Sequence, residues 1–220
     1  MNKFDKININ INDLFQNSSV NTKYKRKNFF FRFLLRYFLG ALIILKIHRR
    51  LINSGIFIGW FDEFKLYWQN ILKGRPLYFH DFHFLLGIYR QRFSTVTTPD
   101  YANEKDFLDS WQNKDTVYQL FGAVRRFSYE PLSCVKYEKY IKNNDTVIEY
   151  GCGIAPITDS LIKYSLLSNI KLYVADIKQI NSHFARWRLG KEAQYVEIHP
   201  YKNALENFSQ QINVVFLITV

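Results

Sequence analysis

Four residues in the second half of the chain have the types and spacing of a nucleoside-binding site: Glu149, Gly151, Gly153 and Asp176. The two glycines allow a tight turn against which a ligand can lie, because neither carries a Cβ atom. Asp176 ends an apolar run about two dozen residues further on, where a carboxylate can accept hydrogen bonds from ribose hydroxyls. A glycine turn alone is a weak signal, but an acid at this spacing indicates a nucleoside ligand.

The segments around these residues alternate between strand and helix patterns. Residues 146–150 are β-branched or aromatic and follow the turn signal 143–145, which predicts a buried strand. Residues 170–175 predict a second strand that ends in Asp176. Between the two strands, helical spacing places a set of apolar residues on one face: Ile154, Ile157, Leu161, Ile162 and Leu166. The predicted helix therefore directs its N-terminus toward whatever lies on the glycines.

The neighbouring residues narrow the kind of nucleoside. Pro156 stands where a dinucleotide-binding turn has a third glycine beneath the pyrophosphate. Glu149 would repel a phosphate and suits a cationic or amine-bearing ligand. Two plainer interpretations stay open, in which the glycines form an ordinary strand-to-helix turn and Glu149 is a solvated charge. Cys152 lies between the glycines without a supporting His or Asn spacing, which favours a small loop-filling residue over a nucleophile.

The segment Val147-Ile-Glu-Tyr-Gly-Cys-Gly-Ile-Ala155 resembles the first motif of class I S-adenosylmethionine-dependent methyltransferases. The resemblance covers roughly residues 140–220 and implies that S-adenosylmethionine is the cofactor. It also implies that Glu149 faces the methionine end of the cofactor and that Asp176 binds its ribose. The expected cofactor-binding residues are Glu149, Gly151, Cys152, Gly153 and Asp176.

The chain beyond Asp176 continues the alternation. It predicts a helix over 179–189, a strand over 194–198, a short helix over 204–208 and a strand over 213–220. Such alternation is typical of an α/β fold with a parallel sheet and right-handed crossovers. The resemblance implies a Rossmann-like sheet with strand order 3-2-1-4, preceded by a mainly helical, aromatic-rich N-terminal region.

The chain departs from the family pattern in three ways. Ala155 stands where the family usually has a third glycine, and Asn213 stands where it often has Asp. Complete members of the family have further strands and helices after the fourth strand, so we expect the chain to be C-terminally truncated. Those later elements often supply contacts to the acceptor and any general base, and we therefore name no catalytic residue.

The positive charge of the chain is concentrated at its N-terminus. The net charge is +11, and residues 1–60 hold eleven Lys and Arg against two Asp, whereas residues 61–220 hold nineteen against seventeen acids. Residues 1–22 are rich in Asn, Lys and Ser, and we expect them to form a disordered tail. Because the remaining body is nearly neutral, no nucleic-acid partner is expected, although a nucleic-acid methyltransferase or binding protein stays an alternative.

Residues 23–50 combine basic and aromatic side chains. Lys23–Lys27 is a basic cluster, and residues 29–46 predict a helix whose uninterrupted apolar core, 37–45, is too short to span a bilayer. Arg32 and Arg36 interrupt the apolar character, as they would not in a secretory signal. This pattern is typical of a helix at a membrane surface, and packing on the protein body or on a partner is the other interpretation.

The middle of the chain carries further helix patterns. Within the helical region 23–93, aromatic residues recur at helical spacing and stop before Gly74 and Pro76: Trp60, Phe61, Phe64, Tyr67, Trp68, Ile71 and Leu72. Residues 94–101 form a polar linker, and helices within 102–142 are expected to cover the cofactor site. Four residues of this region are candidates for the lining of the acceptor pocket: Tyr118, Arg125, Arg126 and Tyr129. The pair His80 and His83 has no third metal ligand nearby, which favours structural or substrate-pocket histidines over a metal site.

The resemblance implies a partial methyltransferase domain over 143–220 that acts on a small-molecule acceptor, sugar-linked or lipid-linked. A membrane-peripheral scaffold without catalytic activity is the main alternative. The two cysteines, Cys134 and Cys152, form no disulfide framework, which favours a reducing compartment such as the cytoplasm. We expect contact with the membrane periphery through residues 23–50.

Overall fold

The computed structural model describes residues 29–45, 59–73, 103–110, 117–127, 137–198 and 212–217. Their elements, in chain order, are α2 (Phe29–Ile44), α4 (Gly59–Asn70), α6 (Glu104–Ser110), α7 (Val117–Phe127), the 3-10 helix η3 (Glu138–Tyr140), β1 (Thr146–Tyr150), α9 (Pro156–Tyr164), β2 (Lys171–Asp176), α10 (Ile180–Leu189), β3 (Gln194–Glu197) and β4 (Val214–Leu217). Several predicted features lie outside the described residues: the tail 1–22, the cluster Lys23–Lys27, the linker 94–101, Cys134 and the helix 204–208.

The four strands form one parallel sheet in the order β3-β2-β1-β4, which confirms the predicted α/β fold class and strand order. The register pairs Tyr150 of β1 with Ala175 of β2, and Asp176 of β2 with Glu197 of β3. Because neighbouring strands run in the same direction, the carboxyl ends of β1 and β2 meet at one edge of the sheet. The segments that follow these two strands carry the residues of the candidate site.

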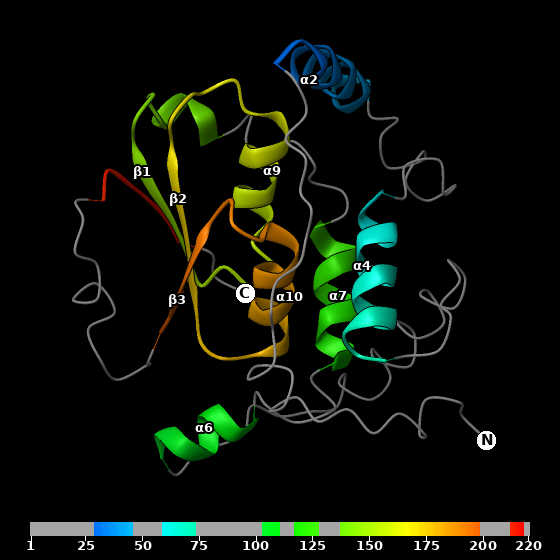
Figure 1. Ribbon diagram of the computed structural model, residues 1–220, viewed down its shortest axis with the longest axis vertical. Coiled ribbons are helices and arrows are strands. Elements are labelled where there is room, and N and C mark those ends of the chain that lie inside the picture. Colours follow the sequence, from blue (N-terminus) through cyan, green and yellow to red (C-terminus); the bar gives the residue numbers. More distant parts are fainter. Residues whose placement is uncertain are drawn as a thin grey trace.

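Helices α9 and α10 cover one face of the sheet, and α7 and α4 pack outside α10 as a further layer (Figure 1). Apolar side chains fill the space between the sheet and α9 and α10, among them Val147, Leu161, Leu172, Ala185 and Leu189. A smaller buried cluster lies on the opposite face of the sheet and consists of Ile148, Tyr173, Ala175 and Ile198. The sheet is thus apolar on both faces, as expected for parallel strands.

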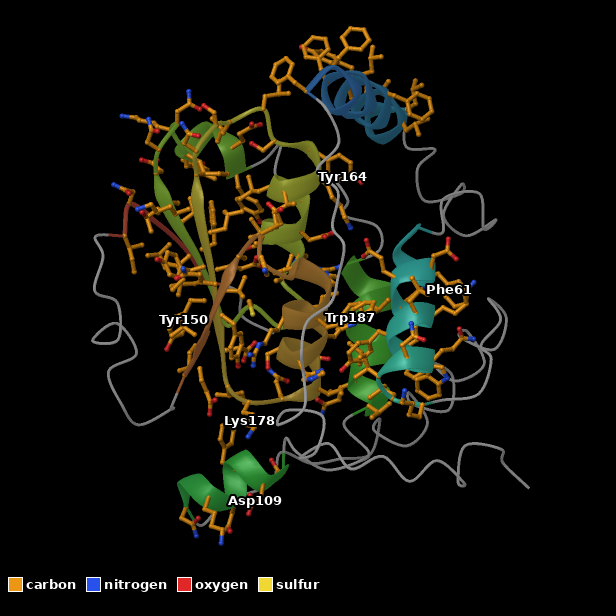
Figure 2. All side chains as sticks on the ribbon, viewed as in Figure 1. Phe61, Asp109, Tyr150, Tyr164, Lys178 and Trp187 are labelled. Atoms are coloured by element: carbon orange, nitrogen blue, oxygen red, sulfur yellow. The ribbon has the colours of Figure 1, made fainter. Side chains whose placement is uncertain are left out.

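The outer layer is held by aromatic side chains. Phe64 of α4 packs edge-on against Phe121 of α7, with ring centroids 4.9 Å apart. Tyr67 of α4 packs against Phe184 and Trp187 of α10, at 5.0 and 5.3 Å, and Trp187 points toward this layer in Figure 2. These contacts bury the face that the aromatic spacing of residues 60–72 predicts. The described part of the N-terminal region is therefore helical and aromatic-rich, and α4 is packed into the body of the protein.

Strand β4 lies at one end of the described sheet. It pairs with β1, and its burial alternates, because Val214 and Phe216 are half-buried whereas Val215 and Leu217 are 47% and 73% exposed. The run is apolar on both faces, which is typical of a central strand, yet β4 exposes one face at this position. Asn213 accepts a hydrogen bond at its Oδ1 from the Thr146 amide, at 2.8 Å.

Candidate functional site

The turn between β1 and α9 lies at the carboxyl edge of the sheet, and positive φ angles shape it. Gly151 has φ +66° and Gly153 has φ +52°, a region in which a side chain is strained. The Cys152 amide donates to the carbonyl oxygen of Ala175 at 3.1 Å, which ties the turn to β2. Apart from its chain neighbours, no heavy atom lies within 4 Å of a Cβ atom built on Gly153, so there is open space beside this glycine although the residue itself is buried.

Ala155 also has a left-handed backbone, with φ +54° and ψ +57°. This conformation favours glycine and costs another residue about 1–2 kcal/mol. The position therefore has the backbone that the family's usual third glycine would suit, although the chain carries alanine there. The Ala155 methyl group is fully buried in the core beneath α9, which offsets part of the strain.

Asp176 lies against the glycine turn. Its Oδ2 accepts a hydrogen bond from the Gly153 amide at 2.6 Å, and its Oδ1 accepts from the Ile177 amide at 2.7 Å and from the Gln179 side-chain amide at 2.9 Å. The side chain is buried, and burial raises the pKa of its carboxyl group while the hydrogen bonds oppose the shift. The structure thus brings together the predicted ribose-binding acid and the predicted turn, with protein groups donating to both oxygens.

Glu149 is buried behind the turn, and both of its oxygens point at the first turn of α9. Oε2 accepts a hydrogen bond from the Thr158 amide at 2.7 Å, and Oε1 accepts from the Ile157 amide at 3.3 Å. Because the N-cap residue Ala155 offers no side-chain acceptor, Glu149 supplies the cap that α9 otherwise lacks. Burial raises the pKa of Glu149 to about 7, and the hydrogen bonds from Thr158 and Ile157 partly oppose the shift.

Cys152 is fully buried between these carboxylates. Burial raises the pKa of its thiol well above the ordinary value, and the negative charges of Asp176 and Glu149 raise it further. The side chain is therefore a neutral thiol at physiological pH, which makes it a poor nucleophile. Its backbone amide donates to Ala175 and its carbonyl oxygen accepts from the Ala155 amide at 2.6 Å, while its thiol lies 3.8 Å from the carbonyl oxygen of Gly153.

Arg188, near the end of α10, was not among the predicted site residues, yet it holds the far side of the turn. Its Nη2 donates to the carbonyl oxygens of Ile154 and Ala155. Its Nη1 lies 3.6 Å from Asp159 of α9 and 3.9 Å from Glu63 of α4. The sequence carries only a weak signal of this role, a basic residue in the last turn of a predicted helix, because the contact joins residues more than thirty positions apart.

Lys163 completes a partly buried ionic cluster that we call the α4–α9–α10 cluster: Glu63, Asp159, Lys163 and Arg188. Lys163 lies 2.8 Å from both Glu63 and Asp159. Although burial acts to raise the pKa of Asp159, the neighbouring Arg188 and Lys163 lower it below the ordinary value. The cluster connects α4, from the N-terminal region, to the two helices that flank the glycine turn.

Most of the remaining predicted candidates lie outside the described residues. Arg125 is half-buried on α7, whereas Tyr129 and the side chains of Tyr118 and Arg126 fall outside the described residues. The pair His80 and His83 also lies outside them. Within the parts of the chain that the structure describes, no group of three or more His, Cys, Asp or Glu side chains could hold a metal ion.

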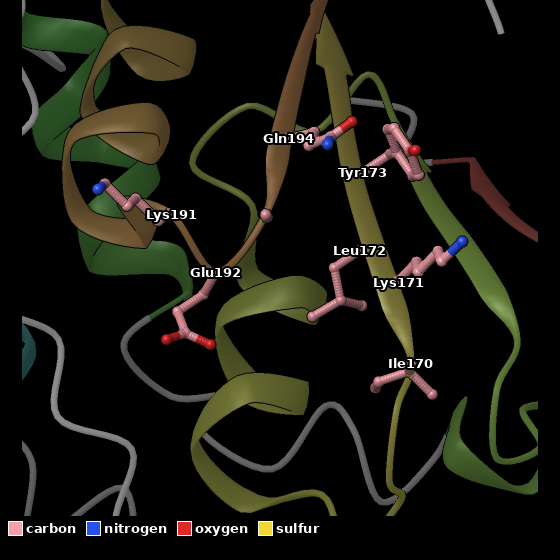
Figure 3. Close-up of a pocket in the computed structure, with 8 residues that line it drawn as sticks. Ile170, Lys171, Leu172, Tyr173, Lys191, Glu192 and Gln194 are labelled. Atoms are coloured by element: carbon pink, nitrogen blue, oxygen red, sulfur yellow. The ribbon is translucent and has the colours of Figure 1, made fainter. Parts of the chain in front are cut away.

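A pocket of about 270 Å³ lies elsewhere, where β2 and β3 begin (Figure 3). Its lining comes from residues 170–173 and 191–194, including Lys171 and Gln194, the first residues of the two strands. Ligands of open parallel sheets bind outside the carboxyl ends of the strands. This pocket is at the opposite edge and is not part of the candidate site.

The structure defines the protein as an α/β protein with a parallel 3-2-1-4 sheet and a glycine turn at its carboxyl edge. Comparisons of the chain with protein-family models, with curated proteins and with solved structures found no match. A sheet of this kind supports many activities, so a functional assignment depends on the site itself.

Proposed function

We propose that the chain binds S-adenosylmethionine at the turn 151–153 and is a methyltransferase-like protein that transfers a methyl group to a small-molecule acceptor. The observation that carries the proposal is the open space beside Gly153, next to the carboxylate of Asp176 at the carboxyl edge of the sheet. A ligand at this position would lie against the backbone of Gly153, which carries no Cβ atom and has room for one although the residue is buried. It would also lie beside the acid that terminates β2, where ribose hydroxyls are bound in related folds.

The residues present fit the adenosyl group. Asp176 accepts from two backbone amides and from the side chains of Gln179 and Cys152, which together fill the roughly four acceptor positions of a carboxylate. Ribose hydroxyls could displace the Gln179 amide and the Cys152 thiol while the backbone bonds persist. Glu149 would act on the sulfonium through its charge, from behind the first turn of α9. When bound, the cofactor supplies an electrophilic methyl group, whose in-line transfer depends largely on positioning.

The location is part of the same proposal. We place the protein in the cytoplasm, with contact to the membrane periphery through residues 23–50. The buried neutral thiol of Cys152 is compatible with a reducing compartment. Among the described helices, none is long and apolar enough to cross a bilayer.

A calorimetric titration with S-adenosylhomocysteine tests the cofactor site. The unmodified chain is expected to release binding heat, Gly153→Ala to lose it, and Asp176→Asn to bind at least about tenfold more weakly because one acceptor becomes an amide donor. Gly190→Ala is the matched control, since Gly190 also has a positive φ, +59°, but ends α10 and does not line the turn. It should bind like the unmodified chain.

A second function, a scaffold without catalytic activity, is favoured by a different observation. The protein's own N–H groups already donate to every oxygen of Asp176 and Glu149, so both acids have a structural explanation. A scaffold would give no binding heat with S-adenosylhomocysteine and no rise in melting temperature in its presence. Either result with the unmodified chain would contradict the methyltransferase proposal.

A further inference from the structure

Helix α2 carries an extended apolar face that points away from the protein. Six large side chains on this face are exposed, and we refer to them as the α2 outer face: Phe29, Phe30, Phe33, Leu34, Tyr37 and Phe38. Phe30 is 68% and Tyr37 64% exposed. Among the described residues, most exposed large hydrophobic side chains belong to residues 29–45. Contiguous apolar exposure of this kind marks an interaction surface.

The opposite side of α2 is fixed to the body. Leu42 is buried, and α2 contacts α9, whose last residue, Tyr164, lies close to α2 in Figure 2. Sticks on the outer side of α2 project away from the rest of the molecule in the same view. The outer face is therefore presented by a docked helix, and its exposed positions recur at the three- and four-residue spacing of a single helical face.

The sequence on both sides of α2 is strongly basic. Lys23, Lys25, Arg26 and Lys27 precede the helix, and Lys46, Arg49 and Arg50 follow it, with no acid anywhere in residues 14–61. An apolar face flanked by cations is complementary to a layer whose interior is apolar and whose surface is anionic. A second copy of the chain fits less well, because a symmetric contact between two outer faces would bring two basic segments together.

We propose that the α2 outer face docks flat onto an anionic lipid surface. A helix of 16 residues is about 24 Å long, shorter than the roughly 30 Å apolar core of a bilayer, which favours lying in the interface over spanning it. This inference rests on the proposed contact of residues 23–50 with the membrane periphery and names the face and the lipid that make it, and the docking does not depend on cofactor binding.

The docking also fixes an orientation. In Figure 1, α2 lies at one end of the long axis of the molecule, and in Figure 2 Lys178, just after β2, lies toward the other end. A protein docked through α2 would hold the carboxyl edge of its sheet away from the lipid. A ligand of the glycine turn would then arrive from the aqueous side, so an acceptor embedded in the same bilayer is disfavoured.

Vesicle flotation with the full chain tests the docking. Phosphatidylcholine vesicles with about one third phosphatidylserine should carry the unmodified chain, and vesicles of phosphatidylcholine alone should carry much less. The double variant Phe30→Asp and Tyr37→Asp should bind at least about tenfold more weakly. Leu66→Asp is the matched control, because Leu66 is an exposed leucine, 48% exposed, on α4. It should float like the unmodified chain.

Two outcomes would overturn the docking. One is equal flotation of the double variant and the unmodified chain. The other is a dimer of the unmodified chain, detected by light scattering without vesicles and abolished by the double variant, since the face would then serve a second copy. Neither outcome touches the titration with S-adenosylhomocysteine, which is performed without lipid.

A polarity-sensitive fluorophore tests the orientation. Attached to Leu34→Cys, it should shift to shorter wavelength when anionic vesicles are added, and attached to Lys178→Cys it should not shift. The unsubstituted chain, labelled in parallel, gives the contribution of the native cysteines. A shift at position 178 as large as at position 34 would overturn the proposed orientation.

Discussion

Helices α4 and α2 are both rich in aromatic residues, yet they end in opposite environments. In α4, Phe64, Tyr67 and Trp68 are completely buried between α7 and α10. In α2, Phe30 and Tyr37 are among the most exposed large side chains of the described chain. The comparison shows that aromatic content identifies a helix that must cover an apolar surface, but does not identify the surface.

Polar residues distinguish the two helices. The hydroxyl group of Tyr67 lies 2.6 Å from Nδ1 of His183, and Glu63 joins the α4–α9–α10 cluster through Lys163. Because these polar groups of α4 find their hydrogen-bond and ionic partners on α9 and α10, these contacts fix α4 against the body of the protein. The face of α2 that is exposed contains Phe, Leu and Tyr, and none of these needs a charged partner. A lipid surface can therefore cover it.

The largest expected difference between the two helices is in the free energy of unfolding. Phe64→Ala should reduce it by about 4 kcal/mol, because the substitution leaves a cavity among Phe121, Trp68 and Phe184. Phe30→Ala should change it by less than about 0.5 kcal/mol. Urea denaturation followed by circular dichroism measures both. Equal losses would mean that the α2 outer face is packed in solution.

Arg188→Met tests whether the ionic cluster joins α4 to the turn. The substitution removes the cation that faces Asp159 and both turn carbonyl oxygens, and we expect a loss of about 3 kcal/mol in unfolding free energy. The matched control is Arg186→Met on the same helix, where the exposed guanidinium lies 5.8 Å from the Tyr195 ring. That change should cost at most about 1 kcal/mol. Similar losses for both would exclude a special role of Arg188.

Local patterns in the sequence predict the elements of the sheet well. The run 146–150 matches β1 residue for residue, and the helix predicted over 179–189 matches α10 with Gln179 as its N-cap. The glycines of the turn also have the positive φ angles expected of a tight turn. These features depend on neighbouring residues, whose periodicity and glycine content are visible in the sequence. The strand order came from the family resemblance.

Local sequence patterns did not predict the side-chain contacts that form when the elements pack together. The assignment of Glu149 to the cofactor stays a prediction, and sequence reasoning did not foresee that its carboxylate caps α9. An acid at a strand end shortly before a helix start was the available signal. Arg188 gave no comparable signal, because its contact with the turn requires the complete packing of α10 on α9. The position of α2 could not be predicted either, since its aromatic pattern resembles that of α4.

Two carboxylates near the first turn of α9, the buried Glu149 and the partly buried Asp159, extend the comparison to charge. Asp159 has Arg188 and Lys163 beside it, and its pKa is lowered, whereas burial of Glu149 among backbone donors raises its pKa to about 7. A raised pKa means that the folded state binds the proton more tightly than the unfolded state between the ordinary value of 4.5 and about 7. Glu149 therefore stabilises the fold at low pH, and this stabilisation is lost as the pH rises through 7.

Unfolding free energies of the unmodified chain and Glu149→Gln at pH 5 and pH 8 measure this contribution. The unmodified chain should lose stability relative to the variant between the two values, by at most roughly 3 kcal/mol. Asp159→Asn is the control without this pH dependence, because the stabilisation from a lowered pKa is fully present above the ordinary value of 3.8 and is lost only below it. Parallel pH profiles for the unmodified chain and Glu149→Gln would show that Glu149 stays ionised in the fold. The α9 amides would then satisfy its charge as fully as Arg188 and Lys163 satisfy that of Asp159.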